Sequence, residues 1–288
     1  MKKIIAFISI LTLTATTVFS QKVTGQLKFE QGQNLSVTVR IKTNISQQAM
    51  GQAIDFMADG SASHLYKVTN ATNDNTTLHH QVQQIGFNFD GMGQKRSFDS
   101  NNEKDMNGQF GKPIKEMLGK TYDMILDPNG KVLIVMPEKT DTTKMDQRMA
   151  IITNMLKGVL EIVLPPQKGA DSFFKVLPEN EKGIGDTWNE SKENKTGKIN
   201  TVYTLSAITD STIEVDFKET SVTVSKAEMM GSETATTMNN STTGKYILDK
   251  ATGILREKTY TTESNGSTEI MGTTLPITSR ATTTITVK

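Results

Sequence analysis

The three histidines of this chain, His64, His79 and His80, have the side chains best suited to metal binding or acid–base catalysis. His79 and His80 are adjacent, and neighbouring residues of a β-strand point to opposite faces, so these two cannot readily bind one metal ion. His64 shares a strand face with Tyr66 and would meet His80 if their strands pair. We interpret all three as ordinary strand residues, and we predict no metal site and no cofactor.

Methionine sulfur is the other metal ligand that the sequence offers, and a methionine-only copper site is conceivable in an exported protein. The chain has 15 methionines. However, Met50 and the pair Met229-Met230 lack the close M-x-x-M spacing that such a site needs. We therefore expect the methionines to fill gaps in a core.

Catalysis by a nucleophile needs a base beside it, and the sequence offers few partners. It contains no cysteine and no G-x-S-x-G turn. Asp186, just before Thr187 and Trp188, is better explained as a turn residue than as a catalytic acid. Because two carboxylates far apart in the sequence can still meet in a fold, a glycosidase-like hydrolase stays open as the minor alternative. We predict a non-enzymatic protein with no catalytic residues.

The N-terminus has the pattern of an export signal. Two lysines after the first Met precede an apolar run over residues 4–13, and Val18 and Ser20 occupy the −3 and −1 positions of a cleavage site. This predicts a signal peptide over residues 1–20, cleaved after Ser20, and a periplasmic or secreted protein. The absence of cysteine excludes a lipoprotein anchor. No later stretch approaches the length of a transmembrane segment.

Charge and composition narrow the class of partner. The formal net charge is +1, and no run of Lys or Arg stands out, so we expect no nucleic-acid binding and no capture by anionic membranes. The chain is rich in Thr, which together with Val and Ile suits half-exposed sheet surfaces. The expected fold is rich in β-strands.

The first half of the mature chain has the alternation of long strands. Leu35, Val37, Val39 and Ile41 alternate with polar residues, and Leu27 with Phe29 predicts a preceding strand joined to them by a hairpin. After Val82 the apolar positions change parity to 85, 87 and 89, which predicts a β-bulge near residues 83–84.

Between these strands the pattern is less regular. We expect a strand over residues 45–58, an exposed loop over residues 90–109 and one or two helical turns over residues 112–118. Pro113 suits the first turn of that helix, and Gly119 suits its C-terminal cap.

The middle of the chain predicts one principal amphipathic helix. Its apolar stripe is Met145, Met149, Ile152, Leu156, Val159 and Val163, at spacings of three and four. Pro165 and Pro166 end it. Two interpretations stay open: the helix packs on a sheet face, or it is a movable lid over an apolar cavity.

Two pairs of segments recur in the same order. Residues 119–135 and 244–255 both start with Gly-Lys and contain a Tyr-led strand, Leu-Asp and a turn closed by Gly. Residues 66–82 resemble residues 203–217, and the apolar parity after Phe217 changes again, to Val222 and Val224. This predicts internal duplication, with a first β-rich half at 21–136, a helical connector at 137–178 and a second half at 179–288.

The ordered motifs resemble a family of exported Bacteroidota proteins built on a domain of unknown function. The motifs are Leu27-Lys28-Phe29-Glu30-Gln31-Gly32-Gln33, Gly119-Lys120-Thr121-Tyr122, Leu126-Asp127-x-x-Gly130-Lys131-Val132, Gly185-Asp186-Thr187-Trp188, Gly244-Lys245-Tyr246-x-Leu248-Asp249 and Leu275-Pro276-Ile277. The resemblance covers nearly the whole mature chain. It implies localisation and architecture and supplies no catalytic residues.

We therefore predict a mainly β (α+β) fold: curved antiparallel sheets in two related halves, half-barrel-like, with one principal amphipathic helix between them. The predicted function is binding or carrying a hydrophobic small molecule in a cavity between sheet and helix. The alternative is a structural or interaction protein that meets a component of the cell envelope. The candidate ligand-binding residues are Met145, Met149, Ile152, Leu156 and Trp188, the last of which either packs at a strand end or stacks on the ligand.

Overall fold

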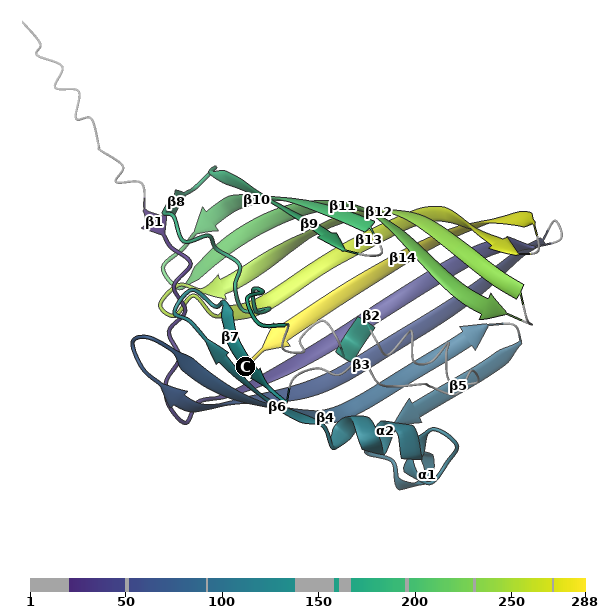
Figure 1. Cartoon of the computed structure of the whole chain (residues 1–288), viewed down its shortest axis with the longest axis horizontal. Helices are drawn as coiled ribbons and strands as arrows, with labels where there is room; N and C mark the ends of the chain where they lie inside the picture. The colour runs from purple at the N-terminus through teal and green to yellow at the C-terminus, as the bar shows by residue number, and fades with distance from the viewer. Residues whose placement is uncertain are drawn as a thin grey trace, which may run out of the picture.

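The computed structural model describes residues 21–49, 52–91, 93–137, 158–160, 167–194, 197–229, 232–270 and 272–288. Twelve strands form one sheet in which every pairing is antiparallel. The long strands curve, as Figure 1 shows, and we call the concave side of the sheet the trough. The predicted fold class, a mainly β chain with a large curved antiparallel sheet, is confirmed.

The first half contributes β2 (Asn34–Ala49), β3 (Gln52–Ala71), β4 (Thr76–Gly91), β5 (Gln94–Asp99), β6 (Thr121–Leu126) and β7 (Val132–Met136). The second half contributes β9 (Thr187–Asn194), β10 (Gly197–Ile208), β11 (Thr212–Met229), β12 (Ser232–Asp249), β13 (Leu255–Ile270) and β14 (Thr273–Val287). The short strands β1 (Lys22–Val23) and β8 (Lys182–Gly183) pair separately.

The strand order is β7-β6-β4-β3-β2-β14-β13-β12-β11-β10-β9, with β5 paired to β4. Starting from the β9 edge, the strands of the second half come first, from β9 to β14. The strands of the first half follow, from β2 to β7, so each half is laid out in chain order. The two halves meet in the middle of the sheet, where Val39 of β2 pairs with Ile285 of β14.

Alternation determines which side chains point into the trough, and the predicted bulge is present. Ser63 pairs with Gln84 while the next residue, His64, pairs with Val82, so Gln83 is the extra residue. The bulge lets Val82 and Ile85 both lie buried on the inner face.

Three predicted segments differ from the structure. Residues 27–29 form no strand, because the backbone N–H groups of Leu27 and Lys28 donate to the carbonyls of Pro128 and Thr252, in two distant turns. The expected strand over 45–58 is divided between β2 and β3, which pair with each other. The expected loop over 90–109 contains β5, whose Phe98 packs on Phe87, and the short helix α1 (Glu103–Met106).

The second change of apolar parity, after Phe217, is not accompanied by a bulge. The β11–β12 register runs unbroken from Thr212 to Met229, so β11 has no bulge against β12. Val222 and Val224 lie on the outer face with 46% and 43% of their surface exposed. The apolar residues change face there because the inner face itself becomes polar.

Two other helical segments agree with the sequence prediction. α2 (Gly111–Leu118) covers the predicted helical turns, and Gly119 is its C-terminal cap. Residues 158–160 are helical, and Val159 is fully buried. The rest of the predicted principal helix, with Met145, Met149, Ile152 and Leu156, lies outside the described residues. Within the described ranges, no helix is long and apolar enough to cross a membrane.

The repeated Leu-Asp…Gly element forms a corner in each half. In both, the register shifts by one residue just before the turn, at Ile125/Leu126 and at Ile247/Leu248. The glycines that close the turns have positive φ, 83° at Gly130 and 70° at Gly253. This backbone region favours glycine, so the glycine in the motif is explained.

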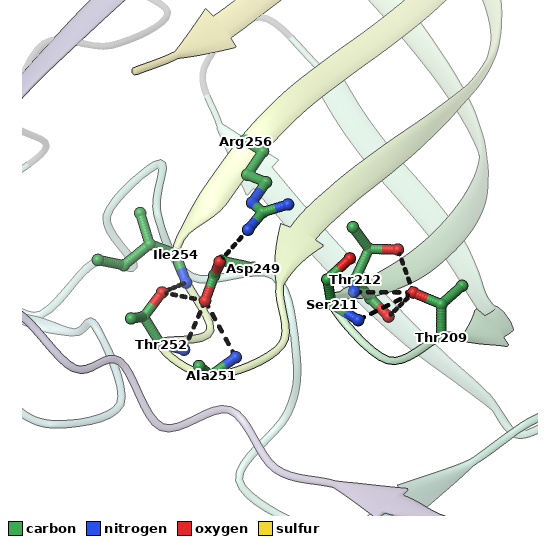
Figure 2. Close-up of polar contacts among 8 residues, drawn as sticks. All are labelled: Thr209, Ser211, Thr212, Asp249, Ala251, Thr252, Ile254 and Arg256. Atoms are coloured by element: carbon green, nitrogen blue, oxygen red, sulfur yellow. Dashed lines mark hydrogen bonds and ion pairs between the residues drawn. The ribbon is translucent and has the colours of Figure 1, made fainter.

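Side-chain hydrogen bonds hold these corners. Asp127 Oδ1 accepts from the backbone N–H groups of Asn129 and Lys131 at 2.9 and 2.8 Å. Asp249 Oδ1 accepts from the N–H groups of Ala251 and Thr252, and its Oδ2 pairs with Arg256 (Figure 2).

Figure 2 also shows the neighbouring β10–β11 turn, where Thr209 Oγ1 accepts from the N–H groups of Ser211 and Thr212.

We call the end of the trough that holds these turns the closed end. Its core includes Phe174, Leu177, Ile254 and Leu255. The chain between β1 and β2 crosses this end and joins the two corners through Leu27 and Lys28. The opposite end, where β2 passes into β3 and β13 into β14, is called the far end.

Candidate functional site

The candidate site is the trough face, defined as the side chains that point inward from β2–β4 and β9–β14. In the first half this face is mostly apolar from the closed end to the far end, although Thr43 and Gln47 also point inward. Near the closed end its residues are fully covered, with Val37, Val39 and Ile85 at 0% exposure. Towards the far end the inward apolar side chains are only half-buried: Ile41, Ile45, Ile54, Phe56, Ala58 and Phe89.

A buried histidine pair, His64 of β3 and His80 of β4, interrupts this apolar face. His64 Nδ1 is 3.0 Å from His80 Nε2, and His64 Nε2 is 3.3 Å from the carbonyl oxygen of Val159. A carbonyl only accepts, so His64 Nε2 carries a proton and its Nδ1 accepts from His80. His80 Nδ1 is then a buried acceptor without a hydrogen-bond partner in the described part of the chain. The pair joins the sheet to the helical turn at 158–160.

Burial keeps both rings neutral. Desolvation lowers the pKa of His64 to about 4, and the hydrogen bond to Val159 opposes this only partly. Desolvation, with the charges of His64 and His79, lowers the pKa of His80 to about 3.

The structure confirms that His64 meets His80 across β3 and β4. His79 points to the opposite face, where its Nδ1 lies 2.7 Å from Asp123 Oδ1. Among the described residues, no group of three metal-ligating side chains comes together.

The second half lines the trough differently. A row of aromatic rings crosses its strands near the closed end. Trp188 stacks on Tyr203 with ring centroids 5.2 Å apart, Tyr203 lies 6.3 Å from Phe217, and Phe217 lies 4.9 Å from Tyr246. Tyr260 of β13 completes the row, 6.1 Å from Phe217.

Lys258 projects into this aromatic row. Its Nζ lies 4.6 Å from the Tyr246 ring centroid, 4.8 Å from Tyr260 and 5.1 Å from Phe217. Burial lowers the pKa of Lys258, an effect that the negative charge of Glu219 partly offsets. Cation–π attraction compensates for part of the lost hydration.

Beyond the aromatic row, towards the far end, the second half presents hydroxyl and amide groups. Thr201 Oγ1 donates to Glu219 at 3.1 Å, and Thr242 and Thr262 are hydrogen-bonded at 2.9 Å. Asn240 donates to the hydroxyl groups of two inward residues of β11. These bonds satisfy polar groups of this surface without a ligand.

Of the five predicted ligand-binding residues, the structure describes Trp188, which lies in the aromatic row. Its indole Nε1 is buried without a hydrogen-bond partner in the described residues. The sequence reasoning missed Lys258 and the row around it. The sequence contained one signal for it. Lys258 is two residues from Tyr260, so both side chains point to the same face of the strand, and a charged residue at an apolar face is unusual.

The comparisons with known proteins give fold likenesses at low identity. No curated protein matches the sequence significantly. Among solved structures, lipovitellin, in a study of its lipid–protein interactions, matches with 9% identity and a TM-score of 0.49 over 91% of this chain and 25% of that chain. This chain therefore spans about a quarter of the lipovitellin chain.

Two further solved structures also match. A channel from Pseudomonas putida F1 has 8% identity and a TM-score of 0.28, over 91% of this chain and 98% of that chain. OccK5 (OpdH) from Pseudomonas aeruginosa has 6% identity and a TM-score of 0.27, over 88% and 98%. Likenesses this distant carry no functional inference.

A family model matches residues 73–255, a segment that contains both corners and the Gly-Asp-Thr-Trp motif. The match spans more than half of the sequence, and this chain belongs to DUF6263, a family of unknown function.

Proposed function

We propose that this is an exported, non-enzymatic protein that binds or carries a hydrophobic ligand on the trough face. The observation behind the proposal is the row of inward apolar side chains, among them Ile45 and Phe56, that continues beyond the buried core and stays half-buried. In a water-filled trough such residues would remain partly hydrated. Each methylene of a ligand buried against them contributes about 0.8 kcal/mol.

The predicted helix would cover the ligand from the opposite side. In this arrangement Met145, Met149, Ile152 and Leu156 contact the ligand, and methionine side chains adapt well to ligands of different shape. The contact from His64 to the Val159 carbonyl, at 3.3 Å, would anchor one end of the helix while the rest moves.

Export is the second part of the proposal and rests on residues 1–20. The mature protein would begin at Gln21 and reside in the periplasm or the medium without a lipid anchor. The intact mass of the protein recovered from these fractions tests this. A mass that retains residues 1–20, or one that carries a lipid, would contradict it.

The binding proposal is tested by native mass spectrometry of the mature protein purified from its own cells. We expect a co-purified lipid that leaves on activation in the gas phase. Phe56→Gln, which places an amide on the trough face, should reduce the bound fraction severalfold. Met57→Gln is the matched control, because Met57 points outward and is 54% exposed. A wild-type protein without ligand, or equal loss in both variants, would count against binding on this face.

An interaction protein of the cell envelope is the second candidate, and β7 favours it. This strand lies at one edge of the sheet and leaves Leu133, Ile134 and Met136 exposed at 38%, 42% and 51%. Exposed strand edges with apolar side chains can pair with another chain. If this candidate is right, Ile134→Lys abolishes crosslinking to an envelope partner, while the wild-type native mass spectrum contains no ligand.

A further inference from the structure

Lys258 is a charged side chain on the inner face of β13, between Tyr246 of β12 and Ile285 of β14 in the register. An inward lysine is expensive because an ammonium group loses its hydration on burial. Buried lysines are usually paired with a carboxylate. Within the described ranges no carboxylate forms an ion pair with Lys258.

The aromatic rings around Lys258 stabilise its positive charge but do not occupy its hydrogen-bond donors. Three rings lie within 5.1 Å of Nζ, and ring faces attract a cation without using its N–H donors. Glu219 lies two inward rows further towards the far end, where its carboxylate accepts from Thr201 at 3.1 Å. The ammonium group therefore keeps hydrogen-bond donors for a further acceptor.

In the register, Lys258 connects to the apolar first half through Ile285 of β14 and Val39 of β2. β14 and β2 separate β13 from β3, and the inward row that contains Phe56 passes through Ile45, Ser279 and Ser264. Ser264 is six residues from Lys258 along β13. Three strand spacings and six residues of strand give a diagonal path of about 25 Å from Lys258 to Phe56. This is the scale of one long acyl chain.

We infer that Lys258 binds the headgroup of a single-chain amphiphile with one negative charge, a fatty acid carboxylate, whose chain lies along the half-buried apolar face of the first half. The inference rests on the proposed binding function and specifies its ligand class. The carboxylate replaces the ion pair that Lys258 lacks among the described residues. A single charge fits better than a dianion, because one lysine beside Glu219 cannot neutralise two charges.

The test compares two ligands with the same chain and different headgroups. The mature protein is titrated with oleate and with oleyl alcohol, using calorimetry and the fluorescence of Trp188, the only tryptophan. We expect oleate to bind at least tenfold more tightly than the alcohol. Lys258→Met should remove this preference by weakening oleate at least tenfold and leaving the alcohol within threefold. The variant should fold, since replacing a buried charge by an apolar group of similar size is often neutral or stabilising.

Lys218→Met is the matched control. Lys218 lies on β11, two strands from β13, points outward and is exposed, so its loss should change neither affinity. Glu219→Gln gives an independent readout, because removing the nearby negative charge should tighten oleate severalfold without affecting the alcohol.

The outcomes separate this inference from the proposed function. If wild type binds oleate and the alcohol equally, or if Lys258→Met keeps the preference for oleate, the headgroup assignment is wrong while binding of a hydrophobic ligand stands. If wild type binds neither ligand, both the assignment and the proposed function fail.

Discussion

The two halves of the sheet use the same corner but line the trough differently. Each corner has Leu-Asp before the turn, a glycine of positive φ after it and a one-residue register shift at the same place. The trough faces beside them diverge: Ile and Phe continue to the far end in the first half, and Thr, Ser and Asn replace them in the second. The corner therefore fixes strand register, while the inward residues are free to specialise.

The largest expected effect tests whether the corners are equivalent. Leu126 and Leu248 precede the two turns and are 0% and 1% exposed. Leu126→Ala and Leu248→Ala should each lower the free energy of unfolding by about 2–5 kcal/mol through loss of buried surface and the cavity that remains. Urea denaturation measures both. A loss confined to one variant would show that only one corner supports the core.

The next largest effect is a loss of stability at acidic pH. It should arise from the first half alone, because all three histidines lie there. The folded-state pKa values of His64 and His80, about 4 and about 3, lie below the unfolded value of about 6.5. The unfolded chain therefore binds protons first as the pH falls. The contribution of the neutral pair is complete above about pH 6.5 and is lost as the pH falls towards 4.

We expect each ring to reduce the free energy of unfolding by about 2 kcal/mol between pH 7 and pH 5. The double variant His64→Leu/His80→Leu should be correspondingly less sensitive to acid in chemical denaturation at a series of pH values. His79→Gln, on the opposite face of β4, should keep the wild-type profile. Superimposable profiles for the double variant and wild type would refute the role of the pair.

The two corner aspartates, Asp127 and Asp249, should differ by a smaller amount in their contribution to the free energy of unfolding. Desolvation opposes ionisation of Asp249, but hydrogen bonds from Thr252 and the charge of Arg256 outweigh it and lower the pKa of Asp249. The Asp127 carboxylate accepts two backbone hydrogen bonds, and no arginine among the described residues forms an ion pair with it. Asp249→Ala should therefore cost about 2 kcal/mol and Asp127→Ala about 1 kcal/mol.

Thermal or urea unfolding of the two aspartate variants gives the comparison. The reverse order, with Asp127→Ala more damaging, would mean that the contact with Arg256 adds no stability.

The smallest effect concerns the outer face of the second half. Val222 and Val224 are exposed, so Val222→Thr and Val224→Thr should change the free energy of unfolding by less than about 0.5 kcal/mol. Ser221→Val, on the trough face just before Val222, removes a hydroxyl that accepts from Asn240 at 3.2 Å and should cost more. Equal effects from both faces would contradict the assignment of inward and outward positions.

Patterns local to one strand or one turn were predictable from the sequence. The alternation from Leu35 to Ile41 identified the inner face, and the change of parity after Val82 located the bulge, because two apolar sets on one strand need an extra residue. The meeting of His64 with His80 followed from the pairing of their strands.

Features that depend on distant partners were not predictable in this way. Leu27 and Phe29 alternate like a strand, but the neighbouring backbone donates to turns about 100 and 220 residues further along the chain. Val222 and Val224 look like core positions because apolar character alone does not distinguish an inner face from an exposed outer one. Lys258 and Tyr260 point to the same face of their strand. The sequence therefore identifies Lys258 as inward only if Tyr260 is already known to face the trough.

The central pairing of β2 with β14 has a consequence for the order of folding. These strands come from opposite ends of the sequence, and Val37 pairs with Val287. The β2–β14 pairing at the middle of the sheet cannot form until the last strand is available, although neighbouring strands such as β2 and β3 can pair earlier. If the chain is exported in an extended form, as proposed, the complete sheet would therefore form only after the last strand has crossed the membrane.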